Sequence, residues 1–408
     1  MTDVVLYFHI HQPWRLRRFS FFDIGQGAAY FDDAENERIL RRVAQRCYVP
    51  MGDLLLRLVE RHGGAFRCAF SITGTAIEQM ERWAPEALRG FERLVATGCV
   101  EVLAETSHHS LAFLADGREF EAQVARHRAH LEARFGRPVR SFRNTELVLD
   151  NDVARRAETM GFEALLGEGA DRVLGWRSTH QVFRPRGCRS IGLLLRSYSL
   201  SDDIAFRFTN QGWSEWPLSA AKFASWLERL PGDAAYVGLF MDFETAGEHQ
   251  AADTGILAFL EALPTEALRS GRFAFRTPVE VARARPARAV LDAPRPVSWA
   301  DEERDLSAWL GNDMQRTAHA ALYALAEPVR EAHVRGVPDV LEDWRRLTTS
   351  DHVYYMCTKH WSDGEVHKYF SPYDSPHEAY LTFMNVLDDL ERRTRTPGAA
   401  PVAVRAQE

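Results

Sequence analysis

Lysine is scarce in this chain of 408 residues: 50 residues are basic, and only Lys222, Lys359 and Lys368 among them are lysines. The arginines that make up the rest are scattered along the chain, and the net charge is −7. Proteins that bind nucleic acid usually carry a basic patch or stripe on one face. We therefore expect no nucleic-acid partner.

Long apolar runs are also absent. No apolar segment reaches the length of a membrane span, and the chain enters a strand-like segment directly after Met1, Thr2 and Asp3, without a basic segment followed by an apolar one. We expect a cytoplasmic protein with no membrane partner. The sequence does not indicate an oligomeric state.

Cysteine is too sparse to build a disulfide framework or a cysteine-based zinc site. The chain has five cysteines, an odd number, and no CxxC spacing occurs among them. Two of the five lie inside apolar, strand-like segments. We expect reduced, buried thiols.

Apolar strand-like segments alternate with amphipathic stretches of helical spacing, such as 38–61 and 120–135. This pattern predicts a chain of βα units with about seven parallel strands. The stretch from Trp176 to Ser201 could hold a hairpin in place of a regular unit. The predicted strands lie near 4–10, 66–72, 99–104, 139–144, 163–167, 191–199 and 235–242.

The composition changes after residue 282. Three prolines within Arg283–Pro296 prevent a continuous helix, so residues 283–298 are predicted to be a connecting arm after a catalytic domain that covers 1–282. Helical spacing returns at 302–348 and 375–392, which predicts a helical region over 299–392. Residues 393–408 lack periodicity and are expected to form a mobile tail.

Polar side chains follow three of the predicted strands at the point where each ends. Since the carboxyl ends of parallel strands share one face, where active sites are built, we expect these side chains to converge. The three groups are His9, His11 and Gln12; Arg143, Asn144 and Glu146; and Asp242, Glu244, Glu248 and His249.

Glu146 and Asp242 are the candidate catalytic pair. Two facing carboxyl groups can divide labour, one ionised as nucleophile and one protonated as acid. Either residue alone could cap a helix or pair with an arginine, but the surrounding polar groups favour catalysis. Arg143 would keep Glu146 ionised or form a structural ion pair, and Glu248 and His249 either bind substrate or form a surface salt bridge.

Two further groups of residues, histidines and glutamates, each have more than one interpretation. His9 and His11 have the spacing of metal ligands on one side of a strand, with His108 and His109 as further candidates, so a metal-dependent hydrolase stays open. In the third strand, Glu105 lies nearer the strand end and is the stronger ligand contact, whereas Glu101 could be buried against an arginine.

Several of the ten tryptophans fall in predicted loops, where an indole ring can stack on the apolar face of a sugar. Most single tryptophans belong to a core or an interface. Trp14 and Trp309 are the preferred sugar contacts because each adjoins a polar cluster.

At these residues the chain resembles glycoside hydrolase family 57, which includes α-amylases, 4-α-glucanotransferases, amylopullulanases and branching enzymes. The resemblance covers nearly the whole chain except the tail, and two segments, Gly212–Leu218 and Thr358–Phe370, resemble the archaeal-type α-amylase subgroup. The ordered motifs are His11–Pro13, Gly98–Glu101, Phe142–Leu147, Met241–His249 and Trp299–Asn312.

The resemblance implies an incomplete TIM-like (β/α)7 barrel with a C-terminal helical subdomain, acting with retention and with neither a cofactor nor a catalytic metal. It implies that Glu146 is the nucleophile and that Asp242 is the general acid and base. Glucose hydroxyls would be bound by His11, Glu101 or Glu105, and Glu244. The last motif would bring Trp299, Asp305, Trp309 and Asp313 to the cleft.

Two positions depart from the family pattern. Ala246 stands where a bulky aromatic residue is usual, and Cys99 stands where glutamine is frequent, so substrate preference stays open. The expected partner is an α-glucan or maltooligosaccharide, processed by hydrolysis or by 4-α-glucanotransfer. The alternatives are a metal-dependent polysaccharide deacetylase and a non-catalytic glucan-binding protein.

Overall fold

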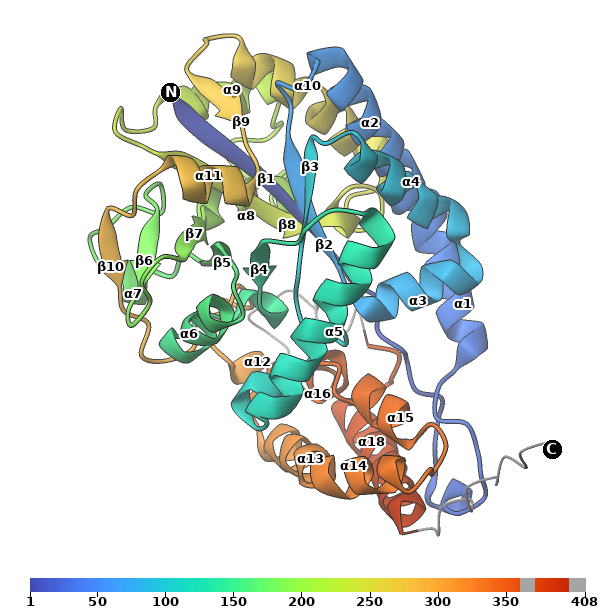
Figure 1. Ribbon diagram of the computed structural model, residues 1–408. Coiled ribbons are helices and arrows are strands. Elements are labelled where there is room, and N and C mark those ends of the chain that lie inside the picture. Colours follow the sequence, from blue (N-terminus) through green and yellow to red (C-terminus); the bar gives the residue numbers. More distant parts are fainter. Residues whose placement is uncertain (360–370, 396–408) are drawn as a thin grey trace, which may run out of the picture. The chain divides into compact units, whose positions relative to one another are not determined.

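A computed structural model describes residues 1–359 and 371–395 (Figure 1). Nearly all of the predicted tail and most of the Thr358–Phe370 motif lie outside these ranges. The described chain divides into two compact units. The first unit comprises Met1–Gln12, Glu37–Ser107 and Glu121–Ala300, and the second comprises Pro13–Asn36, His108–Phe120 and the described residues from Asp301 onward.

Each of the seven predicted strand segments overlaps a strand of the first unit. These strands are β1 (Thr2–Ile10), β2 (Cys68–Ile72), β3 (Val100–Leu103), β4 (Ser141–Arg143), β5 (Ala164–Glu168), β7 (Gly192–Arg196) and β8 (Tyr236–Asp242). β1 and β5 extend one or two residues beyond the predicted bounds. Nearly every residue of these strands is buried, which explains why they read as continuous apolar runs.

Three short strands were not predicted. β6 (Phe183–Pro185) pairs antiparallel with β7, so the stretch before β7 does hold the hairpin-like excursion. β9 (Phe273–Phe275) pairs with β1, and β10 (Ala289–Leu291) pairs with β6. β10 lies inside the stretch predicted as a connecting arm.

The strands form two sheets, in the orders β3-β2-β1-β8 and β10-β6-β7-β5-β4, with β9 attached to β1 (Figure 1). Backbone hydrogen bonds also join the sheets. Arg143 of β4 donates its backbone N–H to the Ala104 carbonyl at 3.0 Å, and Ser197, after β7, donates to the Gly238 carbonyl of β8 at 2.8 Å. A Cβ at Gly238 would lie 2.7 Å from the Leu195 carbonyl oxygen, so only glycine permits this approach of β7 and β8. The architecture is α/β with parallel sheets.

Helices connect these strands. They are α1 (Asp33–Val43), α2 (Val49–His62), α3 (Gly74–Trp83), α4 (Pro85–Ala96), α5 (Gly117–Phe135), α6 (Asn151–Thr159), α7 (Asp171–Leu174), α8 (Tyr198–Ala205), α9 (Ala220–Glu228), α10 (Ile256–Leu268) and α11 (Pro278–Ala284). The helix predicted over 38–61 is interrupted by a π-helical turn, η2 (Ala44–Tyr48), between α1 and α2. Such turns are rare and occur often at functional sites.

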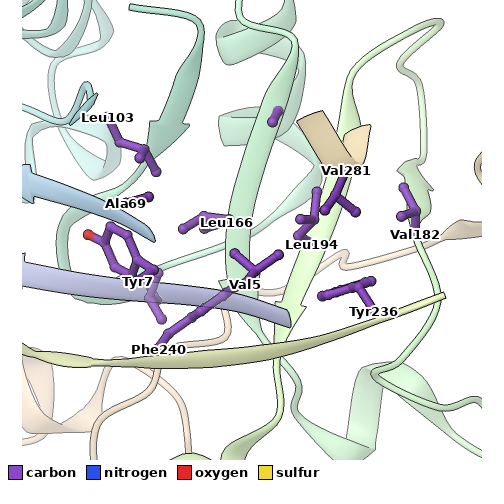
Figure 2. Packing of buried hydrophobic residues seen from close by; sticks show 12 residues of the cluster. Val5, Tyr7, Ala69, Leu103, Leu166, Val182, Leu194, Tyr236, Phe240 and Val281 are labelled. Carbon is purple, nitrogen blue, oxygen red and sulfur yellow. The ribbon is translucent and has the colours of Figure 1, made fainter. Parts of the chain in front are cut away.

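The core of the first unit lies between the strands (Figure 2). Tyr7 and Phe240 meet edge to face with ring centroids 5.6 Å apart, and the Tyr7 hydroxyl lies 2.6 Å from the Ser71 hydroxyl. The other members are aliphatic apart from Tyr236. They are Val5, Ala69, Leu103, Leu147, Ala164, Leu166, Val182, Leu194, Tyr236 and Val281.

The second unit is helical where the sequence predicted helices. It contains α12 (Ser307–Leu310), α13 (Asp313–Ala324), α14 (Ala326–Val334), α15 (Val340–Leu347), α16 (Asp351–Tyr354) and α18 (Pro376–Thr394). Trp309 and Trp344 are fully buried in it. It also contains Pro13–Asn36 and His108–Phe120, which lie within the linear range 1–282. Among the helices of residues 1–359 and 371–395, none is both long and apolar enough to cross a membrane.

Candidate active site

His9 connects the carboxyl ends of several strands of the first unit. It lies next to Asp242 in the register of β1 and β8, and its Nδ1 is 3.5 Å from Asp242 Oδ1. On the other side of the ring, Nε2 is 3.3 Å from Glu105 Oε2 and 3.0 Å from the Arg143 guanidinium. The predicted convergence of the strand ends is therefore present for these four residues.

Arg143 supplies the fixed positive charge of this group. Its side chain is completely buried, and Nη1 donates to Glu105 Oε2 at 3.2 Å. Burial disfavours a charged guanidinium, but the negative charges around it, including Glu146 and Asp242, hold the pKa of Arg143 above its ordinary value. Arg143 therefore stays cationic and favours the ionised form of both candidate catalytic carboxyl groups.

Asp242 is the final residue of β8, and its side chain is 39% exposed. Burial of part of the group works to raise its pKa, but the hydrogen bond with His9 and the nearby positive charge of Arg143 outweigh that effect. The pKa of Asp242 is consequently below its ordinary value. In the free protein this carboxyl group is ionised at neutral pH.

Glu146 lies in the short 3-10 turn η4 (Thr145–Leu147) directly after β4, with φ of 57° in the left-handed region. A non-glycine residue in this region costs free energy, and such strain is concentrated at active sites. Trp299 Nε1 donates a hydrogen bond to Glu146 Oε2 at 2.7 Å. The Trp299 backbone N–H and the Ser298 hydroxyl both donate to the Glu146 carbonyl oxygen. The carboxylate is thus fixed by the backbone and by an indole donor.

The Trp299 ring also lies near His9 and Arg143. Its centroid is 6.1 Å from that of His9, which contacts Asp242, and the Arg143 guanidinium lies over the indole at 5.4 Å. The set of Glu146, Asp242, His9, Arg143 and Trp299 is called the carboxylate cluster below.

Replacement of Trp299 by phenylalanine is expected to lower kcat about 10- to 100-fold, because a hydrogen bond to a charged group contributes about 1.5–3 kcal/mol. The aromatic ring remains, so KM should change little. Steady-state kinetics on a maltooligosaccharide would measure both parameters. A loss confined to KM would show that the indole contacts substrate and does not orient Glu146.

Glu244, Glu248 and His249 follow β8 and have different surroundings. Glu244 is buried and accepts a 2.5 Å hydrogen bond from Tyr48, whose hydroxyl also accepts from Gln12 Nε2 at 3.2 Å. Glu248 forms an ion pair with Arg42 at 2.7 Å. His249 is partly buried, and burial lowers its pKa despite the charges of Asp242 and Glu248.

His11 lies beside His9 with the two rings stacked, 13° from parallel and with centroids 6.0 Å apart. Its Nδ1 is 3.0 Å from the Thr73 hydroxyl. The predicted side-by-side placement of the imidazoles is present. The Arg143 guanidinium lies 3.0 Å from His9 Nε2, so its positive charge disfavours a metal ion at that nitrogen.

Glu101 and Glu105 have different hydrogen-bond partners. Glu105 is completely buried in contact with His9 and Arg143. Glu101 is the second residue of β3, and it accepts hydrogen bonds from Ser141 Oγ at 2.5 Å and from the Val279 N–H at 3.0 Å. These partners hold α11 and the start of β4. The role of Glu101 in the described structure is to join strands to a helix.

Five predicted binding residues belong to the second unit. Trp14 packs against Phe31, and the Arg346 guanidinium lies over the Trp14 ring. His108 Nε2 is 3.0 Å from Glu342. Asp305 accepts a hydrogen bond from the Ser307 N–H at 2.8 Å. Trp309 is buried beside Tyr354, and Asp313 is 98% exposed and paired with Arg316 at the start of α13. Each therefore has a described packing or capping role, and their contact with substrate stays a prediction.

The sequence analysis missed Glu168 and Arg196, the last residues of β5 and β7. Arg196 donates to the Phe240 carbonyl at 2.8 Å, pairs with Glu168 at 3.2 Å, and lies over the Trp299 ring at 5.8 Å. A polar residue that ends an apolar strand is the signal that identified Asp242, and it applies equally to these two. Tyr48 lies in a helical segment and carries no such signal.

Comparison with known proteins places these observations in a family. The family model described as "Glycosyl hydrolase family 57" matches residues 5–294. A protein of Methanocaldococcus jannaschii named "Putative alpha-amylase" is 37% identical over 398 residues, which cover 94% of this chain and 83% of that protein.

Solved structures show the same fold at low sequence identity. The GH57-type branching enzyme of Pyrococcus horikoshii aligns with a TM-score of 0.66 and 15% identity over 98% of each chain. The 4-alpha-glucanotransferase of Thermococcus litoralis aligns with a TM-score of 0.66 and 13% identity over 86% of this chain and 56% of that longer enzyme. The match of the family model and the relative from Methanocaldococcus jannaschii show that the chain belongs to glycosyl hydrolase family 57.

Proposed function

We propose that the chain is a retaining glycoside hydrolase that cleaves α-1,4-glucan through a covalent glucosyl-enzyme intermediate. The observation that carries the proposal is the carboxylate cluster, in which Glu146 and Asp242 come from different strand ends and both interact with the charge of Arg143. Trp299 holds Glu146, and His9 contacts Asp242. A retaining glycosidase needs two such carboxyl groups on either side of the scissile bond.

Glu146 is proposed as the nucleophile. The charge of Arg143 and the Trp299 N–H stabilise its ionised form, and the strained backbone fixes its direction. Its carboxylate oxygen attacks the anomeric carbon while the leaving oxygen takes a proton from Asp242. Asp242 then removes a proton from water, which breaks the glucosyl ester and regenerates Glu146. A sugar hydroxyl in place of water gives 4-α-glucanotransfer by the same steps.

The proposed substrate-binding residues of the first unit are those that surround the cluster at the strand ends. The predictions for Trp14, His108, Asp305, Trp309 and Asp313 are kept, whereas Glu101 is left out because its contacts are with Ser141 and Val279. The set from the first unit is His9, His11, Gln12, Glu105, Arg143, Glu244, Glu248, His249 and Trp299.

The fold that supports this function is proposed to be an incomplete (β/α)7 barrel in the order β1-β2-β3-β4-β5-β7-β8. The two sheet orders do not join β3 to β4 or β7 to β8. The backbone hydrogen bonds to the Ala104 and Gly238 carbonyls support these two junctions. In such a barrel the catalytic groups lie at the carboxyl ends of the strands. The helices of the predicted region 299–392 would form a separate subdomain, with Trp299 and Ala300 belonging to the first unit.

Incubation with maltoheptaose tests the function. We expect α-anomeric products at early times, seen by NMR before mutarotation, because two displacements at the anomeric carbon retain its configuration. Only shorter products would indicate hydrolysis, whereas a ladder that extends beyond the substrate would indicate transfer. Initial β-anomeric products would overturn the retaining mechanism, and absence of any product over a range of linkages would overturn the glucan assignment.

A further inference from the structure

Glu244 is a buried carboxyl group just after the end of β8. Its side chain accepts hydrogen bonds from the Tyr48 hydroxyl and the His11 backbone N–H. Across residues 1–359 and 371–395, no arginine, lysine or histidine side chain contacts its oxygens. An ionised carboxylate that is removed from water without a paired charge is strongly disfavoured. Glu244 is therefore expected to carry a proton.

Asp242 has the opposite environment, although it lies only two residues away. It is partly exposed, contacts His9 at 3.5 Å, and lies in the field of Arg143. These groups favour the anion. The charge of Asp242 then adds to burial in disfavouring a second negative charge on Glu244, since two neighbouring carboxyl groups do not ionise independently.

From this arrangement we propose that Asp242 and Glu244 share one proton across the neutral range, and that the acid of the reaction is this pair and not Asp242 alone. The inference rests on the proposed function and adds Glu244 to it as the residue that stores the proton. Tyr48 is a positioning residue that holds Glu244 in place.

The titration behaviour supports this assignment. Burial and the charge of Asp242 raise the pKa of Glu244 to about 8, and the Tyr48 hydrogen bond works against them by favouring the anion. Asp242 has a lowered pKa, which by itself would leave the site without an acid at neutral pH. A stored proton on Glu244 resolves this conflict with the acid role of Asp242.

The proton balance is as follows. In the free enzyme the proton is on Glu244 and Asp242 is ionised. When the glycosidic bond breaks, its electron pair goes to the leaving oxygen, which takes a proton from Asp242, while Glu244 yields its proton to Asp242 and becomes ionised. In the second step water gives a proton back to the pair as its oxygen bonds to the anomeric carbon. The pair loses and regains one proton in each cycle.

The π-helical turn η2 places the groups that hold Glu244. Tyr48 comes from this turn, and Gln12 Nε2 donates to the Tyr48 oxygen, so the Tyr48 O–H is directed at Glu244. Cys47, from the same turn, donates to the Phe243 carbonyl at 3.2 Å and fixes the chain next to Glu244. The titratable groups that face Glu244 are thus Tyr48 and Cys47 from η2 and Asp242 from β8, with the His11 N–H from β1.

The pH profile of kcat/KM on maltoheptaose tests the pair. Wild type should lose activity on the alkaline side near pH 8, where Glu244 gives up the proton. Glu244→Gln cannot store a proton, so activity at pH 7 should fall by about 100-fold or more, and the alkaline limb should move to lower pH by about two units or more. Tyr48→Phe removes a hydrogen bond to the anion, so its alkaline limb should move to higher pH.

A second substrate separates proton supply from substrate binding. α-Maltosyl fluoride has a leaving group that needs no proton, so Glu244→Gln should turn it over within about tenfold of wild type. An equal loss on both substrates would overturn the inference, as would an alkaline limb that stays in place in either variant. Wild type that is inert on both substrates would instead contradict the proposed function itself.

Matched controls lie on the surface of the same unit. Glu86→Gln removes an exposed carboxylate on α4, and Tyr198→Phe removes a phenol that donates to Asp171 at 3.1 Å. Both variants should keep the wild-type pH profile on each substrate.

Discussion

Replacement of Glu146 by glutamine is expected to lower the turnover of maltoheptaose by about 10⁴-fold or more, a loss typical of removing a nucleophile that acts as part of a unit. The amide keeps the size of the side chain and can still meet the Trp299 N–H through its oxygen, so the fold should persist. However, an uncharged amide does not form the glucosyl ester. Initial rates with maltoheptaose at neutral pH would measure the loss.

A rescue experiment makes the assignment specific. In Glu146→Gly, azide can enter the space left by the carboxylate and attack the anomeric carbon of α-maltosyl fluoride from the nucleophile's face, which should yield a β-glycosyl azide. Glu86→Gln serves as the matched control because its carboxylate is exposed on α4. If Glu146→Gln kept near wild-type turnover, or if azide yielded an α-product, Glu146 would not be the nucleophile.

Replacement of Asp242 by asparagine is expected to lower turnover of maltoheptaose by about 10²- to 10⁴-fold, the usual contribution of a general acid and base. With α-maltosyl fluoride the first step needs no acid, so the glucosyl-enzyme should form at close to the wild-type rate. Its hydrolysis should be slow because no base activates water. Mass spectrometry of the intact protein would then show a covalent adduct.

This trapped adduct also distinguishes the two members of the pair. Glu244→Gln retains Asp242 as the base and should not accumulate the adduct, whereas Asp242→Asn should. The matched control is Asp253→Asn, at an exposed position in the 3-10 turn η6 (Ala252–Thr254). Unchanged activity of Asp242→Asn on maltoheptaose would remove Asp242 from the mechanism and leave the cluster without an acid.

Much of the site is visible in the sequence because strand ends are local features. Apolar runs that stop at a polar residue are enough to identify His9, Arg143, Glu146 and Asp242. The seven strands are found for the same reason, since strands buried on both faces are continuously apolar. The short strands β6, β9 and β10 were missed and are held by pairing with neighbours. β4 is equally short, but the polar group that follows it marked its position.

Contacts between distant segments could not be predicted in this way. Glu101 lies in β3 and Glu105 follows it, and this order along the chain was enough to favour Glu105 as the site residue. The sequence did not indicate their partners, which are Ser141 and Val279 for Glu101, and His9 and Arg143 for Glu105.

The family, the order of the strands along the chain and the two candidate catalytic carboxyl groups can be read from the amino-acid sequence. The surroundings that set the charges of these groups arise only when the chain folds. The hydrogen bond from Trp299 to Glu146 joins residues 153 positions apart in the sequence, and the hydrogen bond from Tyr48 to Glu244 joins residues 196 positions apart. A pKa depends on burial and on charges within a few ångströms, and the folded chain alone brings these groups together.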